Sequence, residues 1–362
     1  MKILIVNDQF ERGGAARVAA TQINGLLNRG HQITVITDNI NYKLNYKLPS
    51  QIKLLQINLK LRSNKVLRWL SCAKTIRKYI KHEDPDVIIA IQSLIFFVVW
   101  IANLGLGKKI IAADHTSFNI KTHPLLNFIR YHFYTYADAL SILTKKDEKI
   151  LGKKFPKKKV IYNPLPFPII TKEVKREKNI LCAGRLESWY IKGFDIILDI
   201  WQAIESLYPE WNLEIAGSGD TSAQKTIHEM ISKRHLDQRV KLLYNVNDMR
   251  SLYQQSSIFV LSSRTEGFPM VLMEAMSQGC ACIAFSVYGA TNEMMSKKSG
   301  IIIEDGNISG FTDALKMLIQ DSNLRAQYAK NAINEIAQFS EERFISSWEN
   351  LLNSVVNPGQ KH

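Results

Sequence analysis

Residues 261–274 read Leu-Ser-Ser-Arg-Thr-Glu-Gly-Phe-Pro-Met-Val-Leu-Met-Glu, in which a buried strand passes through a loop of small residues into a helix. Gly267 and Pro269 fix the turn into this helix, so the first helical N–H groups are predicted to face a ligand. A helix N-terminus carries unpaired donors and about half a positive charge, which suits phosphate oxygens. Glu266 and Glu274 add carboxylates that accept hydrogen bonds from hydroxyl groups. The stretch therefore predicts a ligand with both phosphate and hydroxyl groups; the alternative is an ordinary loop residue and a solvated helix position.

Outward from this stretch, short apolar runs alternate with helical stretches along the whole chain. Strands are predicted first at Lys2–Asn7, Gln32–Thr37, Asp86–Ile91, Lys109–Ala113 and Ala139–Leu143. Three prolines within residues 162–168 interrupt the pattern, as in a stiff linker. It resumes with strands at Asn179–Cys182, Trp211–Ile215, Val240–Tyr244, Ile258–Ser262 and Cys280–Phe285. This alternation predicts an α/β fold with two Rossmann-like parallel-sheet domains, 1–165 and 166–339, facing each other across a cleft.

The composition limits the class of protein. A chain of 362 residues with 46% apolar content is long enough for two domains with separate cores. We expect a cytoplasmic protein, because no secretory signal is visible and the longest apolar stretch, Leu94–Ala102, is too short to span a bilayer. The spacing of the four cysteines forms no zinc signature, so reduced structural thiols are expected.

The net charge of +14 is unevenly distributed: residues 39–82 contain eleven Lys or Arg and no Asp or Glu. Apolar residues recur at helical spacing between the basic residues of this segment, which predicts peripheral contact with an anionic membrane. They are Val66, Trp69, Leu70, Ala73, Ile76 and Ile80. The alternative is a surface helix whose apolar side packs on its own domain. Nucleic-acid binding is disfavoured, because regularly spaced aromatic stacking residues are missing from the basic segments.

Cations follow the first strand of the second domain. Gly184 and Arg185 come directly after that strand, and Lys192 lies just before the next helix. Arg185 can bind a diphosphate through its planar guanidinium, and Lys192 can bind it as a point charge. Either residue alone reads as a solvated loop position. Together, at the carboxyl end of a strand, they predict a diphosphate site.

Other strand ends carry glycine turns or polar residues. Gly13 and Gly14 precede the first helix and allow close approach of a ligand, although they do not form a dinucleotide-binding fingerprint. Gly217 lies in a tight turn after a strand, and Asn245 and Val246 offer backbone groups to a nucleobase. His115 follows another strand and is predicted to face the cleft; a lone histidine is equally compatible with a structural role.

Taken together, these motifs resemble the retaining GT-B-fold glycosyltransferases of family four, which assemble bacterial glycans and polysaccharides. The resemblance covers essentially the full length, and its most specific element is the Glu-x(7)-Glu motif from Glu266 to Glu274. It implies transfer of a hexose or N-acetylhexosamine from a UDP-sugar to a growing capsule, lipopolysaccharide or lipid-linked glycan. It also implies that a final helix, 340–356, crosses back onto the first domain.

The resemblance also assigns roles to residues. Arg185 and Lys192 would hold the diphosphate, Glu274 the ribose and Glu266 the donor sugar, and His115 would contact the sugar or its reacting face. Gly14 would let the first helix approach the diphosphate. Backbone amides would contact sugar and phosphate at Gly267, Phe268, Met270 and Val271. Asp114 stands where many relatives carry Glu.

No metal or other cofactor is expected, because the two cations and the helix N-termini can stabilise the departing charge themselves. The Asp84-Pro85-Asp86 sequence matches a metal-binding pattern of another glycosyltransferase fold, but it precedes a strand at its amino end and reads as a turn. A nucleotide-sugar 2-epimerase of the same fold, or a basic non-enzymatic nucleic-acid-binding protein, is the alternative function.

Overall fold

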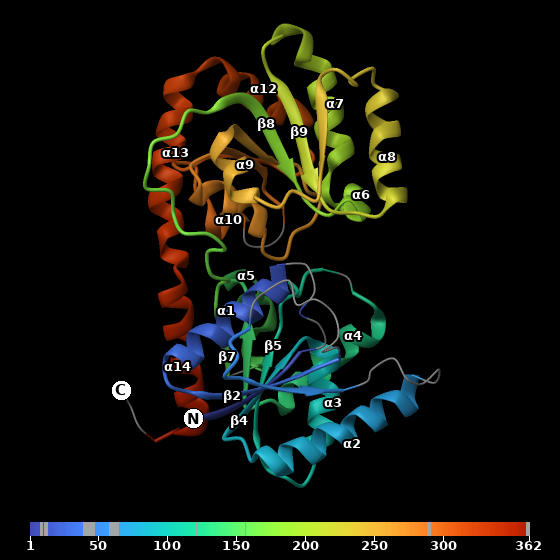
Figure 1. Cartoon of the computed structure of the whole chain (residues 1–362), viewed down its shortest axis with the longest axis vertical. Coiled ribbons are helices and arrows are strands. Elements are labelled where there is room, and N and C mark those ends of the chain that lie inside the picture. Colours follow the sequence, from blue (N-terminus) through green and yellow to red (C-terminus); the bar gives the residue numbers. More distant parts are fainter. Residues whose placement is uncertain are drawn as a thin grey trace. The chain divides into compact units, whose positions relative to one another are not determined.

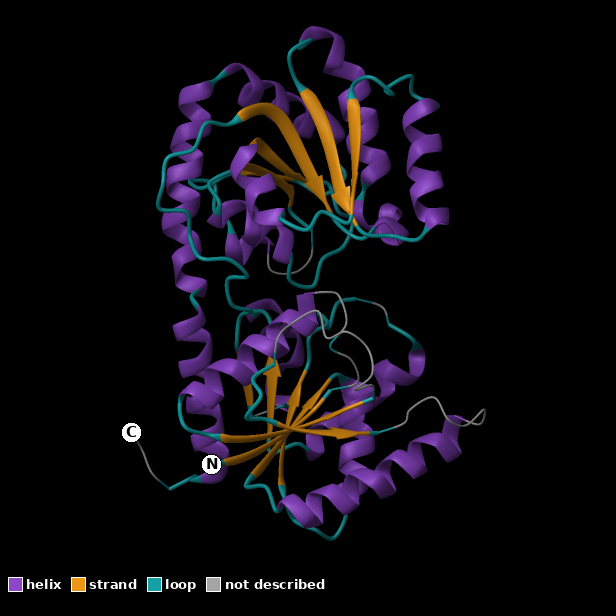
Figure 2. Cartoon of the chain, in the orientation of Figure 1, coloured by secondary structure: helices purple, strands orange, loops and turns teal. Residues whose placement is uncertain are grey.

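The computed structural model describes residues 1–7, 10, 14–38, 48–57, 65–120, 122–155, 157–287 and 291–359. The chain forms two compact units (Figures 1 and 2). Unit 1 contains Met1–Pro164 together with Phe339–His362, and unit 2 contains Leu165–Gln338. Unit 2 is therefore inserted, in sequence terms, before the last helix of unit 1.

The core of unit 1 is a parallel sheet in the order β3-β2-β1-β4-β5-β6-β7. Because the chain moves outward from β1 to β3 and then returns to place β4 on the other side of β1, the switch point lies between β1 and β4. The central strands are apolar and buried on both faces, as a parallel sheet covered by helices requires. The strands are β1 (Lys2–Val6), β2 (Gln32–Thr37), β3 (Lys53–Gln56), β4 (Val87–Ile91), β5 (Lys109–Ala113), β6 (Ala139–Ile142) and β7 (Lys158–Val160).

Helices connect these strands. They are α1 (Gly14–Asn28), α2 (Lys65–Glu83), α3 (Ser93–Asn103), α4 (Pro124–Phe128), the π-helix η1 (Ile129–Phe133), the 3-10 helices η2 (Tyr134–Tyr136) and η3 (Gly152–Lys154), α5 (Lys145–Leu151) and α14 (Glu341–Val356). No helix among the described residues has both the length and the apolar character to cross a membrane.

The last helix, α14, packs against α1, the first (Figure 1). Gly25 makes this approach possible, because a Cβ there would lie 2.2 Å from Cδ1 of Ile345. Arg29 adds a hydrogen bond of 2.9 Å to Glu349. The two helices close one side of unit 1 although more than 300 residues separate them in sequence.

Helix α2 shows how the apolar side of the basic segment is used. Ala73, Ile76 and Ile80 are buried and belong to the same hydrophobic cluster as the strands of unit 1. These three side chains pack on their own domain, as the alternative interpretation expects, whereas Leu70 is 51% exposed. Peripheral contact of the basic segment with an anionic membrane stays a prediction. Residues 39–47 and 58–64 of the basic segment lie outside the described residues.

Unit 2 has a parallel sheet in the order β10-β9-β8-β11-β12-β13, with its switch point between β8 and β11. Its strands are β8 (Glu177–Ala183), β9 (Asn212–Gly217), β10 (Val240–Tyr244), β11 (Ser256–Leu261), β12 (Ala281–Phe285) and β13 (Ile301–Ile303). The helices are α6 (Trp189–Lys192), α7 (Phe194–Ile204), α8 (Thr221–Ser232), α9 (Met249–Gln255), α10 (Met270–Ser277), α11 (Thr291–Met294), α12 (Ile308–Gln320) and α13 (Ser322–Ile336), with short 3-10 turns at Leu186–Ser188, Glu205–Leu207 and Ala337–Phe339.

The two parallel α/β sheets confirm the predicted fold class. Three short strands, β3, β7 and β13, were not expected from the sequence. All three lie at the edges of the sheets. β3 and β7 contain lysines, which obscure an apolar pattern, and β13 is apolar but only three residues long. The Asp84-Pro85-Asp86 turn lies at the amino end of β4, where Asp84 pairs with Lys108 at 2.5 Å and Asp86 accepts the Lys2 amide at 2.8 Å.

Candidate active site

Glycines bring the strand ends of unit 2 close together at its switch point. A Cβ on Gly217, at the end of β9, would lie 2.0 Å from the carbonyl oxygen of Gly184, after β8. Gly193, between α6 and α7, has a φ of 65°, and a Cβ there would lie 1.9 Å from the carbonyl oxygen of Ser262. Only glycine fits both positions. The segments that follow β8, β9 and β11 therefore meet backbone to backbone.

Lys192 and Glu266 form an ion pair at this point. Nζ of Lys192 lies 2.8 Å from Oε1 of Glu266, and the Ser263 hydroxyl donates to the same oxygen at 2.6 Å. The Glu266 side chain is only 8% exposed and that of Lys192 is 19% exposed, so the pair is largely shielded from water. The geometry places a cation and a hydroxyl acceptor within one small cluster, which we call the Lys192–Glu266 cluster.

Arg185 lies nearby along the chain, directly after β8. Its backbone position is held from both sides, because the Gly184 amide donates to Ala216 at 3.0 Å and the Leu186 amide donates to Ser218 at 3.0 Å. Its side chain is exposed and forms no hydrogen bond or ion pair with the described residues. Arg185 is thus a cation available to a ligand.

Helix α10 begins immediately after the Glu266 loop, with Pro269 as its N-cap residue and Met270 as its first residue. The predicted amide donors Gly267 and Phe268 precede it, and Val271 is in its first turn, where an α-helix lacks internal acceptors. Glu274 lies one turn further along, 8% exposed, and accepts a hydrogen bond of 2.8 Å from the Tyr253 hydroxyl. This contact fixes the orientation of the Glu274 carboxylate.

The predicted nucleobase position follows β10. The Asn245 amide donates to the Gly217 carbonyl at 3.0 Å, and Asn245 has a φ of 47°, an uncommon conformation for a residue other than glycine. Asn245 is exposed and Val246 is half-buried. The structure thus places both beside the Gly217 turn.

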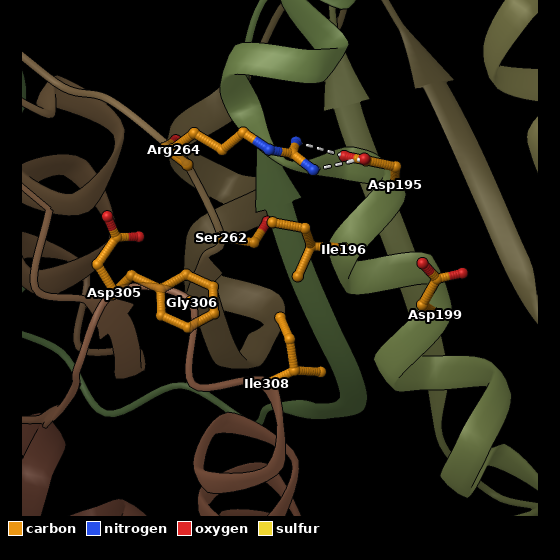
Figure 3. Close-up of a pocket in the computed structure, with 10 residues that line it drawn as sticks. Asp195, Ile196, Asp199, Ser262, Arg264, Asp305, Gly306 and Ile308 are labelled. Atoms are coloured by element: carbon orange, nitrogen blue, oxygen red, sulfur yellow. Dashed lines mark hydrogen bonds and ion pairs between the residues drawn. The ribbon is translucent and has the colours of Figure 1, made fainter.

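Figure 3 shows Arg264 paired with Asp195. Because Asp195 follows Lys192 closely along the chain, this pair joins the segment that carries Glu266 to the segment that carries Lys192. Its guanidinium binds both carboxylate oxygens of Asp195 at 2.7 Å and donates to the Tyr190 carbonyl at 2.5 Å. It also lies 4.0 Å from the centre of the Tyr190 ring, and its own amide donates to Ile191 at 2.8 Å. A bidentate pair of this kind fixes both distance and orientation.

The Arg264–Asp195 pair also forms part of the wall of a cavity of about 410 Å³ between α7 and the turn before α12 (Figure 3). Asp199, Asp305 and Ile308 lie around it. Ser263 is shared between this cavity and the Lys192–Glu266 cluster.

In unit 1, His115 follows β5 with both ring nitrogens buried and without a hydrogen-bond partner among the described residues. Burial lowers the pKa of His115, because its environment penalises the charged form. Neutral imidazole nitrogens that are left unbonded in a buried place are costly unless a ligand completes them. The contact of His115 with the donor sugar stays a prediction.

Two buried carboxylates hold the loop around His115. Asp114 accepts from Arg130 at 2.7 Å and from the Tyr134 hydroxyl at 3.0 Å, and all three side chains are buried. Arg130 also donates to the Thr116 carbonyl. On the other side, Asp147 accepts from the Phe118 amide at 2.8 Å. These contacts leave the backbone on both sides of His115 little freedom.

Sequence reasoning missed several of these contributors. Tyr253, Arg264 and Asp195 were not predicted, since their partners lie on other elements and no spacing in the sequence links them. Ser263 was not predicted either, although its partner Glu266 lies three residues further along the same loop. Gly13 lies outside the described residues, and Gly14 is the first residue of α1. Within the described residues no group of three or more His, Cys, Asp or Glu side chains is arranged to hold a metal ion.

The known proteins to which this chain is similar are glycosyltransferases. The family model for glycosyl transferases group 1 matches residues 168–335, and the model for glycosyltransferase family 4 matches residues 12–166. The chain is 27% identical to the amylovoran biosynthesis glycosyltransferase AmsD of Erwinia amylovora, covering 97% of this chain and 99% of that protein. It is 25% identical to the GalNAc-alpha-(1->4)-GalNAc-alpha-(1->3)-diNAcBac-PP-undecaprenol alpha-1,4-N-acetyl-D-galactosaminyltransferase of Campylobacter jejuni, covering 99% of each chain.

Among solved structures, Anabaena Alr3699/HepE in complex with UDP is similar, with a TM-score of 0.81 and 19% identity over 98% of this chain and all of that chain. At this identity the likeness concerns the fold. Together, the two family models cover nearly the whole chain, one for each parallel-sheet unit. The chain therefore belongs to the GT-B-fold glycosyltransferases of the family-four type.

Proposed function

We propose that this glycosyltransferase moves a hexose or N-acetylhexosamine from a UDP-sugar to a bacterial surface or lipid-linked glycan, with retention of configuration and without a metal. The observation that carries the proposal is the Lys192–Glu266 cluster beside the unpaired Arg185, at the switch point of unit 2. Ligands of open parallel sheets bind outside the carboxyl ends of the strands at this point.

The charges of the cluster suit a diphosphate leaving group. Negative charge develops on the nucleotide diphosphate as the bond to the sugar lengthens, and fixed cations stabilise it. Lys192 has three donors, so it can keep its bond to Glu266 and still donate to a phosphate oxygen. Arg185 has no competing partner among the described residues and supplies the second cation.

The acidic residues suit hydroxyl groups. Ser263 and Lys192 both bond Oε1 of Glu266, which leaves the second carboxylate oxygen to accept from a sugar hydroxyl. Glu274, oriented by Tyr253, would accept from the ribose. We do not assign either residue as a nucleophile. In the proposed front-face reaction the departing phosphate oxygen takes the proton of the acceptor hydroxyl, and the acceptor oxygen bonds to the anomeric carbon on the same face.

The relatives support the finer parts of the proposal. One is named for amylovoran biosynthesis, another transfers N-acetylgalactosamine to an undecaprenol-linked glycan, and a structure of the same fold holds UDP. These suggest a UDP donor and a surface or lipid-linked acceptor for this chain.

A panel of UDP-, GDP- and ADP-linked sugars tests the donor. A true donor at about a hundredfold its dissociation constant stabilises the protein by about 2.7 kcal/mol, which a thermal shift detects. Mass spectrometry then follows transfer to a glycan acceptor, with EDTA present in a parallel sample.

Variants of the cluster test the site. Arg185→Ala and Lys192→Met should each lower kcat/KM, with a loss of transition-state stabilisation of about 2–4 kcal/mol. Lys225→Gln, on the exposed side of α8, should leave kcat/KM unchanged. Full activity of Arg185→Ala would refute the diphosphate assignment. Formation of a new epimer from the donor alone would point instead to a nucleotide-sugar epimerase.

A further inference from the structure

A cavity in unit 2 lies apart from the residues that are predicted to bind the donor. It has a volume of about 410 Å³ and lies between α7 and the turn before α12 (Figure 3). Small-molecule sites in proteins have volumes of about 300–1,000 Å³, so the cavity is large enough for a ligand. Its lining includes none of the described residues that are predicted to contact the diphosphate, the ribose or the donor sugar. The cavity is therefore a separate place for a ligand.

Three side chains, those of Phe285, Ile196 and Ile308, give the cavity an apolar surface. Phe285, at the end of β12, is buried, and its ring centre lies 4.6 Å from that of Phe311 in the core of unit 2. Ile196 of α7 is half-buried, and Ile308, the first residue of α12, is 40% exposed. A ligand in the cavity can therefore pack an apolar face against carbon atoms that the core holds in place.

Carboxylates line the cavity on either side of this apolar surface. Figure 3 shows Asp305 and Asp199 on opposite sides of the two isoleucines. Asp305 forms no hydrogen bond or ion pair with the described residues. Asp199 accepts from Arg234 at 2.6 Å through Oδ1, which leaves Oδ2 without a partner in the described part of the chain. Both carboxylates can therefore still accept hydrogen bonds from a ligand.

Arg264 adds hydrogen-bond donors to the same space. Its side chain lines the cavity and forms three hydrogen bonds, two to Asp195 and one to the Tyr190 carbonyl. A guanidinium carries five N–H groups, so these bonds do not use all of its donors. Because the bidentate bond to Asp195 fixes the orientation of the guanidinium, the remaining donors have a defined direction.

The charges of the lining favour a neutral ligand. Arg264 and Arg234 pair with Asp195 and Asp199, so two of the three carboxylates are already neutralised. The third, that of Asp305, is exposed to water, and an exposed charge attracts a cation only weakly. The same carboxylate disfavours an anion. Among the described residues, no three His, Cys, Asp or Glu side chains are arranged to hold a metal ion. A neutral molecule with hydroxyl groups and an apolar face fits these conditions.

We propose that this cavity is a second sugar-binding site, which holds a neutral sugar unit of the acceptor glycan apart from the donor. The ring of a hexose presents C–H groups on its faces and hydroxyl groups around its edge. The C–H groups would pack on Ile196 and Ile308, while the hydroxyl groups would donate to Asp305 and Asp199 and accept from Arg264.

The position of the cavity gives this site a use in glycan assembly. Ser263 lines the cavity and donates to Glu266 at 2.6 Å, so the bound sugar unit would lie next to the Lys192–Glu266 cluster. A glycan that is held at one unit presents its other units at a raised local concentration. The assignment of the sugar to the acceptor rests on the function proposed above, whereas the binding of a sugar in the cavity does not.

The test is saturation-transfer difference NMR of the full chain in the presence of UDP. The probes are the methyl α-glycosides of glucose, galactose, N-acetylglucosamine and N-acetylgalactosamine, and wild type should bind at least one of them. Asp305→Ala removes a hydroxyl acceptor and should weaken this binding at least about fivefold. Ile308→Trp places a larger side chain in the cavity and should abolish the binding.

Asp313→Ala and Met317→Trp are the matched controls. Both residues are exposed and lie on α12, as Ile308 does, but neither lines the cavity. Both variants should bind the sugar as wild type does. Unchanged thermal unfolding would show that Asp305→Ala and Ile308→Trp are folded.

Two results would overturn the proposal. One is that wild type binds none of the four sugars, and the other is that Ile308→Trp binds the sugar as well as wild type does. The thermal shift that UDP causes is measured separately on the same samples. A failed donor assignment therefore stays distinguishable from a failed sugar site.

Discussion

Gly193→Ala tests whether the close approach of two backbones positions the Lys192–Glu266 cluster. Gly193 has a φ of 65°, and an added Cβ would lie 1.9 Å from the Ser262 carbonyl oxygen and 2.7 Å from its carbon. A left-handed conformation costs a residue other than glycine about 1–2 kcal/mol. The clash with rigid backbone adds about 1–3 kcal/mol, because either β11 or the start of α7 must shift.

Gly107→Ala is the matched control. Gly107 has a φ of 69°, close to that of Gly193, but a Cβ there would meet nothing within 4 Å. Both variants therefore carry the same conformational cost, and only Gly193→Ala carries the clash. Gly107 lies in unit 1 and Gly193 in unit 2, so the loss of stability is measured for each variant on the transition of its own unit, relative to wild type. The difference between the two losses isolates the clash, and in a unit of this size 1 kcal/mol lowers Tm by about 2–4 °C.

Differential scanning calorimetry and donor turnover are the assays. Relative to wild type, Gly193→Ala should lower the Tm of unit 2 by at least about 2 °C more than Gly107→Ala lowers that of unit 1. It should also lose about a hundredfold in kcat/KM, because a shift of about 1 Å misplaces Lys192 next to Gly193. Gly107, between α3 and β5, should leave turnover unchanged. If both variants have the same Tm and the same kcat/KM, the backbone contact does not position the cluster.

Three further predictions concern other parts of the structure. Arg264→Gln and Asp195→Asn should each lower kcat/KM about tenfold to a hundredfold, with a smaller effect on thermal stability. Either change breaks the ion pair that links the Glu266 segment to the Lys192 segment. Steady-state kinetics that match wild type would contradict this. Burial lowers the pKa of His115, so below the ordinary histidine pKa of about 6.5 the unfolded chain takes up a proton that the folded protein does not. Stability that is present above that pH is therefore lost as the pH falls. In urea unfolding from pH 7.5 to 5.5, the free energy of unfolding should fall less for His115→Phe than for wild type, and an equal fall would count against this. All four cysteines are buried, and burial raises the pKa of Cys182 to about 12, so a maleimide should label none of them in the native protein and all of them in urea; rapid native labelling would refute this.

The fold could be predicted because strand-and-helix alternation is a local pattern, repeated along the chain. The predicted bounds of the strands Gln32–Thr37, Lys109–Ala113 and Val240–Tyr244 are those observed. The edge strands β3, β7 and β13 escaped, because each is three or four residues long and lies where little surface is buried.

For α2, periodicity left open what the apolar side of the helix contacts. Spacing shows that Ile76 and Ile80 share one side of a helix, but it does not show whether that side faces the core or an external partner. The contact of Phe97 with Phe133 had no local signature either, because the two residues come from different helices and meet only in the folded unit.

The candidate site was partly predictable for a similar reason. Arg185, Lys192 and Glu266 each follow a strand or precede a helix, and strand ends of a parallel sheet share one edge. The pairing of Lys192 with Glu266 joins residues 74 positions apart, and that of Arg264 with Asp195 joins residues 69 apart. Such distances are set by the sheet order and by glycine contacts, which no spacing in the sequence reveals.

The place of α14 has a consequence for biosynthesis. Unit 2 is made from one continuous stretch, whereas unit 1 needs both Met1–Pro164 and the segment that begins at Phe339. On the ribosome, the surface of α1 around Gly25 must therefore wait, uncovered, until Ile345 has been translated. Domains generally fold as units during synthesis. Unit 2 can therefore complete its folding before unit 1, although its translation begins later. The apolar surface of α1 therefore stays exposed while unit 2 is translated. During this interval a chaperone can bind it.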